Sequence, residues 1–244
     1  MLKDFSKTKQ EKETREALAK DRDTALKQAC QEAEDGRPFA TFYGEIETHV
    51  AAAAARGDAK ASEDLGSALC VAAKHSRLRV VRRLLEIPAV MRLSVDRKTA
   101  ALYDAVSMPD PSPKRANVVA ALVEAKAEVD GIVSEKKSWA LSQAAENGHT
   151  DAMRVLLWCK ADPNKGTNTP TYISAFSNQV DAVQLLLGAK ADPDKGLNDG
   201  TSPVYMASEK NNVEALAALL EAKADPNAEN KVRRGTSGVA SGWG

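Results

Sequence analysis

The chain has 244 residues, and its 34 lysines and arginines balance 34 aspartates and glutamates, so the formal net charge is zero. A neutral chain offers no general electrostatic reason to bind nucleic acid or an anionic membrane surface. No apolar run approaches the roughly 18 residues that span a bilayer, so membrane insertion is not expected. The N-terminus, Met1–Phe5, lacks the apolar core of a secretory signal. We therefore expect an intracellular protein, cytoplasmic or nuclear, with no signal peptide or transmembrane segment.

Residues 1–62 are expected to form a helical N-terminal extension. Residues 11–34 are rich in Lys, Glu, Arg and Ala, which favours helix, but their apolar residues form no sustained heptad seam. The segment 35–38 contains Gly and Pro and interrupts the helix, and residues 41–55 could form a second one. This charged helical pair is suited to cap the apolar core that follows, and the alternative is that it docks separately.

From residue 63 to residue 230 one pattern recurs: a short apolar helix, a Gly, Asn or Ser, a second apolar helix, and a turn. The expected helix pairs are 66–73 with 80–85 in unit one, 102–106 with 117–123 in unit two, and 140–147 with 150–157 in unit three. The residues between the two helices of units one, three, four and five are Ser76, Gly148, Asn178 and Asn211. Gly and Asn are the residues that most readily end a helix in the left-handed conformation. The pattern predicts stacked antiparallel helix pairs with projecting loops.

A four-residue phrase marks the turn at the end of each unit. Ala-Asp-Pro-Asn stands at 161–164 and 224–227, Ala-Asp-Pro-Asp at 191–194, and a weaker Ala-Glu at 127–128. The spacing is roughly 30 to 34 residues, and a fixed period in this range indicates a solenoid of stacked units. The recurring aspartates are interpreted as turn residues rather than as general acids.

The units resemble ankyrin repeats. The resemblance rests on Ala144–His149 followed by Val155–Leu157 and Ala161-Asp162, and on pieces of a Thr-Pro-Leu-His signature at Thr169–Tyr172 and Gly200–Ala207. It extends from about Gly66 to Asn227 and implies an all-α ankyrin-repeat solenoid of about five repeats. The family usually has Gly before the Ala-Asp of the loop, whereas this chain has Lys126, Lys160, Lys190 and Lys223. A row of four lysines along one edge is conceivable, but their recurrence favours homogenisation of the array over a function.

Two segments depart from the repeat. The prolines of residues 108–114 in unit two are expected to end its first helix and to form a stiff loop, and the alternative is a loop that carries a function. Residues 231–244 contain Gly235–Ser241, which echoes Gly200–Met206. We expect this tail to be the start of a truncated sixth repeat or a frayed end, and the chain could be a fragment of a longer array.

Motifs for catalysis or for cofactor binding are absent from the sequence. The three cysteines, Cys30, Cys70 and Cys159, form no CxxC pair. The three histidines, His49, His75 and His149, lie too far apart to form a helical metal pair. Neither GxxxxGK[ST] nor GxGxxG nor GxSxG is present. We therefore expect no enzyme, no catalytic or metal-binding residues, and no cofactor.

The resemblance to ankyrin repeats implies a concave binding face lined by the first helices and the loop tips. The candidate partner-binding residues on this face are Trp139, Gln143, Asn147, Ile173, Phe176, Ser177, Met206 and Lys210. Ile173, Phe176 and Met206 are expected to form one apolar patch, because exposed apolar residues anchor interfaces. The alternative is that these three side chains pack into the neighbouring unit.

A basic cluster in unit one and after it comprises Arg77, Arg79, Arg82, Arg83, Arg92, Arg97 and Lys98. It is interpreted as a solvated helix face, and docking of an acidic partner is the alternative.

The function that the sequence favours is a non-catalytic scaffold or adaptor that binds another protein and is a monomer outside a larger complex. A structural subunit of a larger protein assembly is the alternative.

Overall fold

The computed structural model describes residues 59–109, 112, 114–133 and 138–228. The expected helical pair in residues 1–58 and the tail from residue 229 lie outside these residues. In the described part the secondary structure is helical, apart from one isolated antiparallel bridge between Val133 and Ser138. The fold is therefore all-α, as predicted.

Five helix pairs follow one another in the described part of the chain. The first helices of the pairs are α3 (Ala59–Lys74), α6 (Val95–Ser107), α8 (Ala140–Glu146), α10 (Pro170–Phe176) and α12 (Pro203–Glu209). The second helices are α4 (Leu78–Leu85), α7 (Arg115–Glu124), α9 (Thr150–Trp158), α11 (Val180–Gly188) and α13 (Val213–Glu221). A short helix, α5 (Pro88–Met91), lies between the first pair and the second.

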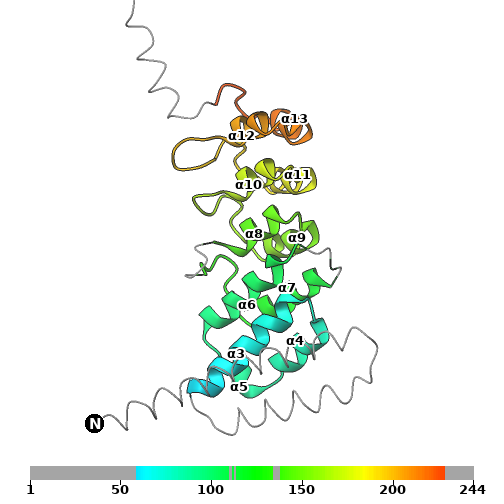
Figure 1. The fold of residues 1–244 in the computed structure, drawn as a ribbon, viewed down its shortest axis with the longest axis vertical. Coiled ribbons are helices and arrows are strands. Elements are labelled where there is room, and N and C mark those ends of the chain that lie inside the picture. The colour runs from blue at the N-terminus through cyan, green and yellow to red at the C-terminus, as the bar shows by residue number, and fades with distance from the viewer. Residues whose placement is uncertain (1–58, 110–111, 113, 134–137, 229–244) are drawn as a thin grey trace, which may run out of the picture.

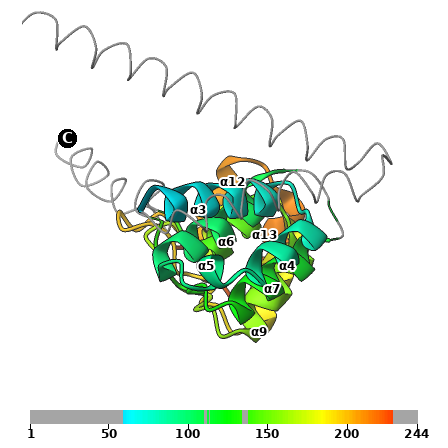
Figure 2. The ribbon, with the colours of Figure 1, turned by 90° about the horizontal axis from the view of Figure 1, so that it is seen from below.

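The pairs stack along the long axis of the molecule, from α3 to α13 (Figure 1). First helices pack on first helices and second helices on second helices, as in the contacts of α8 with α10 and of α9 with α11. A view along the stack separates α3 and α6 from α4, α7 and α9 (Figure 2). The array therefore has a first-helix side and a second-helix side.

The buried apolar residues form two clusters along the stack, a large one that extends from Leu65 to Ala191 and a smaller one towards α12 and α13. Leu69, Leu102 and Leu141 are buried from first helices, and Leu84, Leu122, Leu156, Leu186 and Leu219 are buried from second helices. The second-helix leucines recur at the period of the repeat, so each pair buries one leucine against its neighbours. Such nearest-neighbour packing is what stabilises a solenoid.

Left-handed residues end the helices at two positions in the repeat. Ser76, Gly148, Asn178 and Asn211 follow first helices and have φ between 53° and 69°. The lysines Lys126, Lys160, Lys190 and Lys223 follow second helices and have φ between 64° and 70°. At Lys160 the next N–H, of Ala161, donates to the Leu156 carbonyl at 3.0 Å, which closes the helix end. The lysines thus occupy the backbone position that Gly takes in the family.

The Ala-Asp-Pro-Asn turn links each repeat to the next by side chains. The Asp162 carboxylate accepts a hydrogen bond from the Asn164 N–H at 2.8 Å, which forms the turn. The side-chain oxygen of Asn164, Oδ1, then accepts from the Asp192 N–H of the following repeat, also at 2.8 Å. Asp130 and Asp194 accept in the same way from the Asp162 and Asp225 N–H groups. The recurring polar residues of the phrase therefore have structural roles.

The N-terminal pairs differ from the predicted helix pairs. α3 is 16 residues long and begins at Ala59, ahead of the expected domain start at residue 63, and α6 begins at Val95 instead of residue 102. The Ser94 hydroxyl accepts from the Arg97 N–H at 3.4 Å and caps α6. α5, which the sequence did not predict, stands where the later repeats have the Ala-Asp-Pro loop. None of the described helices has the length and apolar character required to cross a bilayer.

Candidate partner-binding surface

The candidate residues occupy three equivalent positions on the first helices. Gln143, Ile173 and Met206 share one position, Glu146, Phe176 and Glu209 the next, and Asn147, Ser177 and Lys210 the third. The first position is half-buried in all three repeats and the second is exposed in all three. The third position is half-buried at Asn147 and Ser177 and exposed at Lys210. The structure brings four of the candidates together as one surface and assigns internal contacts to three others.

Phe176 is an exposed aromatic residue on the first-helix side. Its side chain is 46% exposed at the last turn of α10. The Lys210 ammonium of the next repeat lies 5.0 Å from the centre of the Phe176 ring, within the range of a cation–π interaction. Ile173 and Met206 are half-buried on the same helix faces. We call these four residues, Ile173, Phe176, Met206 and Lys210, the α10–α12 patch.

Asn212 holds the end of α10 that carries Phe176. Its side-chain amide donates to the carbonyls of Ala175 and Phe176 at 2.7 and 3.0 Å. His149 has the equivalent position in the third pair, and its Nε2 lies 2.7 Å from the Met108 carbonyl. Sequence reasoning missed Asn212, although its place directly after the left-handed Asn211 matches that of His149 after Gly148. The exposed ring of Phe176 thus lies at the end of a helix whose last carbonyls are hydrogen-bonded by the next repeat.

Gln143 and Asn147 take part in contacts between the second and third pairs. The Tyr103 hydroxyl donates to Gln143 Oε1 at 2.6 Å, and the Gln143 amide donates to Glu146. The Asn147 amide donates to the Val106 carbonyl at 2.8 Å. Both side chains satisfy neighbouring polar groups, so a partner would have to compete for them.

Trp139 lies against a loop of its own repeat. It is half-buried at the N-cap of α8, and a Cβ at Gly166 would come 2.7 Å from its ring. The equivalent residues Thr169 and Ser202 are hydroxyl caps, which accept from the N–H groups of Tyr172 and Tyr205. The ring of Trp139 therefore replaces a hydroxyl cap with a packing contact. Ser177, the last candidate, is the half-buried C-cap of α10.

The basic cluster of the first two pairs divides between the surface and the interior. Arg79, Arg82, Arg83, Arg92 and Arg97 are exposed, and Arg83 pairs with Glu86 at 2.7 Å. Lys98 is 5% exposed, and its ammonium donates to the Met91 carbonyl at 2.8 Å. Lys98 was expected on a solvated face, and that expectation is wrong. Its buried ammonium donates to the carbonyl of the last residue of α5.

Burial and hydrogen bonding shift the pKa values of three titratable groups. Burial raises the pKa of Tyr103 and that of Tyr172, so both hydroxyls keep their protons at neutral pH. Hydrogen bonds from the side chain and the backbone of Thr201 lower the pKa of Asp199. Within the described ranges, no group of three or more His, Cys, Asp or Glu residues could hold a metal ion.

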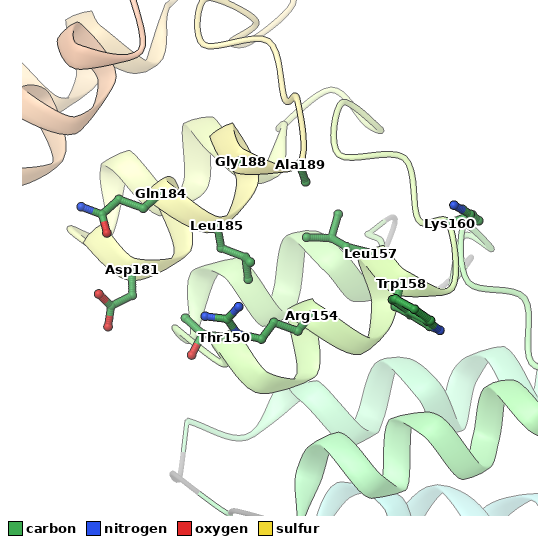
Figure 3. A pocket seen from close by; sticks show the side chains of 10 residues that line it. All are labelled: Thr150, Arg154, Leu157, Trp158, Lys160, Asp181, Gln184, Leu185, Gly188 and Ala189. Atoms are coloured by element: carbon green, nitrogen blue, oxygen red, sulfur yellow. The ribbon is translucent and has the colours of Figure 1, made fainter.

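A second surface feature lies on the second-helix side, between α9 and α11. A groove there is lined by residues of both helices, among them Arg154, Trp158 and Gly188 (Figure 3). Trp158 is 85% exposed. Trp158 directly follows the apolar run Val155–Leu157 in the sequence, and its helical phase sets it opposite the buried Met153 and Leu156.

A family model described as ankyrin repeats, in three copies, matches residues 141–230. This range begins in α8 and includes α9 to α13, the three pairs whose loops carry the Asp-Pro phrase. A comparison with curated proteins finds no match. Ankyrin repeats are in general modules for binding other proteins, and the family is typically non-catalytic. The family match and the helical fold together identify residues 141–230 of this chain as three ankyrin repeats.

Proposed function

We propose that this chain is a non-catalytic scaffold or adaptor that binds another protein through the concave, first-helix face of its array. The observation that supports the proposal is the α10–α12 patch. Phe176 is 46% exposed there, beside the charged Lys210. An aromatic ring next to a cation, with half-buried Ile173 and Met206 around it, has the composition of an interface centre with a polar rim.

The patch is formed by two adjacent repeats and held by internal contacts. Asn212 fixes the end of α10, and α10 packs directly on α12. A partner that covers Phe176 would therefore meet a surface whose backbone is already ordered, which lowers the entropic cost of binding. Trp139, Gln143, Asn147 and Ser177 are proposed as outer members of the face, since the first three already have internal contacts.

The test is the double variant Phe176→Ser/Met206→Ser. We expect a small change in the midpoint of thermal unfolding, because Phe176 is exposed and Met206 is half-buried, and a large loss of partner in pull-downs from native extract analysed by mass spectrometry. Removal of a central aromatic anchor typically costs 2 kcal/mol or more of binding, about 30-fold in Kd. Met91→Ser is the matched control, because Met91 is 53% exposed in α5, outside the patch.

Two results would count against the proposal. A strong loss of thermal stability in the double variant would mean that Phe176 and Met206 belong to the core. Unchanged stability together with unchanged partner capture would mean that the interface lies elsewhere on the array.

A structural subunit of a larger assembly is the second candidate, and the exposure of Trp158 on the opposite side favours it. Such a subunit would bury the second-helix side as well as the first-helix side. Gel filtration of native extract separates the two functions, because an adaptor exchanges between free and bound forms. A structural subunit would elute only in a large particle.

A further inference from the structure

The groove between α9 and α11 is bordered by two parallel rows of side chains (Figure 3). Thr150, Arg154 and Trp158 form the row on α9, and Asp181, Gln184 and Gly188 form the row on α11. Leu157, Leu185 and Ala189 lie between them. The two helices have the same length of nine residues and pack against each other, so residues with the same place in the repeat lie at the same level.

Trp158 departs from the repeat at its position. The residue two places before each left-handed lysine is Glu124, Trp158, Gly188 and Glu221 in successive pairs. Two pairs thus have a charged side chain, whereas the third has a Trp that is 85% exposed. An indole exposed to this degree on a helix end is costly in water and is the kind of residue that anchors interfaces.

Gly188 departs from the repeat in the opposite sense. It is the last residue of α11, and a Cβ placed on it would meet no heavy atom within 4 Å. Its φ is not positive, so neither backbone strain nor close packing requires glycine there. The position therefore forms a notch in the surface, one repeat away from the protruding indole.

A protrusion and a notch at equivalent levels on adjacent helices make the surface complementary to itself. A two-fold axis parallel to the helices and midway between them would place α9 of one copy over α11 of the other. Each Trp158 would then face the Gly188 of the other copy, and the contact would occur twice, as in any two-fold interface. We propose that a second copy of this chain docks here, with each Trp158 indole seated over the Gly188 notch of the other copy.

Two of the three charged side chains that line the groove, Arg154 and Asp181, agree with this arrangement. Arg154 and Asp181 are both exposed and line the groove from opposite helices. They form no ion pair with each other within the described chain, since no such contact lies within 4.0 Å. In the two-fold arrangement Arg154 lies three residues, about 4.5 Å along the helix axis, from the level of the other copy's Asp181. An extended arginine side chain bridges that distance, so each copy offers a cation to the acidic end of the other.

The contact area predicts a weak dimer. Two tryptophans supply about 300–500 Å² of buried surface, and stable specific interfaces bury about 1,200–2,000 Å². The rest must come from the Thr150–Arg154 and Asp181–Gln184 rows. We therefore expect a dimer that forms at micromolar or higher concentration, whereas the sequence had suggested a monomer.

The experiment is sedimentation velocity of the full chain across a range of concentrations from about 1 to 500 µM. The weight-average sedimentation coefficient of the wild-type chain is expected to rise with concentration. Trp158→Gly and Gly188→Trp are each expected to weaken the dimer at least 10-fold, because one lacks the protrusion and the other fills the notch. The double variant Trp158→Gly/Gly188→Trp exchanges protrusion and notch, and it is expected to dimerise again.

Phe176→Ser is the matched control, since it removes an exposed aromatic from the other side of the array and should leave the dimer unchanged. Thermal melts check that each variant is folded. A wild-type chain that stays monomeric at every concentration would overturn the proposal. It would do so even if fluorescence quenching showed that a peptide or another protein covers Trp158, because the proposed occupant is a second copy. The proposal also fails if the exchange variant remains as weak as the single variants, because then Trp158 does not face Gly188.

Discussion

The three C-terminal pairs and the two N-terminal pairs are joined to their neighbours by different chemistry. From α8 to α13 the loops are linked by short polar side chains, such as Asn164, which accepts from the next repeat's backbone. The junction between the first two pairs instead uses long or buried polar groups. Lys98 donates to the Met91 carbonyl there. Within the second pair, the buried Thr99 hydroxyl accepts from the Glu128 N–H at 3.0 Å.

The difference shows two ways to satisfy backbone groups between stacked helices. A loop with a fixed turn places the same small acceptor in every repeat, so the pattern is visible in the sequence. A junction without that loop has to satisfy its carbonyls with whichever side chain reaches them. The family match covers residues 141–230, the region of the first kind.

The largest expected effect is in the core of the middle repeat. Leu156→Ala should lower the free energy of unfolding by about 2–5 kcal/mol, because Leu156 is fully buried and α9 packs against both α7 and α11. Leu219→Ala in α13 is the matched control, and it should cost less because fewer described neighbours enclose that helix. Urea unfolding of both variants measures the difference. A larger cost for Leu219→Ala would show that residues after 228 complete the core.

The next effect tests the long, buried polar side chains of the N-terminal pairs. Arg115 is 2% exposed, and its guanidinium donates to the Ala105 carbonyl at the end of α6. Arg115→Met keeps most of the volume but leaves that carbonyl without this donor, so we expect a loss of about 1–3 kcal/mol. The exposed Arg154→Met should change stability by less than about 0.5 kcal/mol. Equal effects in urea unfolding would remove the distinction between the two regions.

A smaller effect should come from the loop linkage of the C-terminal repeats. Asn164→Ala removes the acceptor of the Asp192 N–H and should cost about 0.5–1.5 kcal/mol. Asn227 holds the same place in the last described turn, where its N–H bonds to Asp225. Asn227→Ala should therefore cost less than Asn164→Ala. If hydrogen exchange showed no faster exchange of the Asp192 amide in Asn164→Ala, the linkage would contribute nothing to the loop.

The smallest effect concerns the left-handed lysines, which both regions share. Lys126→Gly and Lys190→Gly should each change the free energy of unfolding by less than about 1 kcal/mol. Relief of roughly 1 kcal/mol of left-handed strain is offset by the greater freedom of glycine in the unfolded chain and by loss of a cation at the helix end. Thermal melts of the two variants should agree with each other. A large loss in only one would reveal a role for that lysine beyond the helix end.

Much of the fold could be predicted because it depends on local rules. The left-handed positions at Ser76, Gly148, Asn178 and Asn211 were identified from residue type and spacing, and the structure confirms them. The pair of helices at 140–147 and 150–157 followed from the apolar pattern, and the structure has α8 and α9 there. The candidate site was predictable only as a set of helix positions. The sequence could not show that Asn147 bonds to the Val106 carbonyl while Phe176 stays exposed, since both depend on the neighbouring repeat.

The sequence by itself determined the period, the helix pairs and the turn phrase, because backbone conformation and amphipathic spacing act within one repeat. Only the tertiary structure decided which side chains at equivalent positions of the repeat are exposed to solvent and which contact the neighbouring repeat. α5, the buried Lys98 and the pairing of Lys210 with Phe176 arise from contacts between residues of different helices. The exposed Trp158 beside the notch at Gly188 arises in the same way. Burial is a property of the stack, and the surface that remains open depends on how adjacent repeats cover one another.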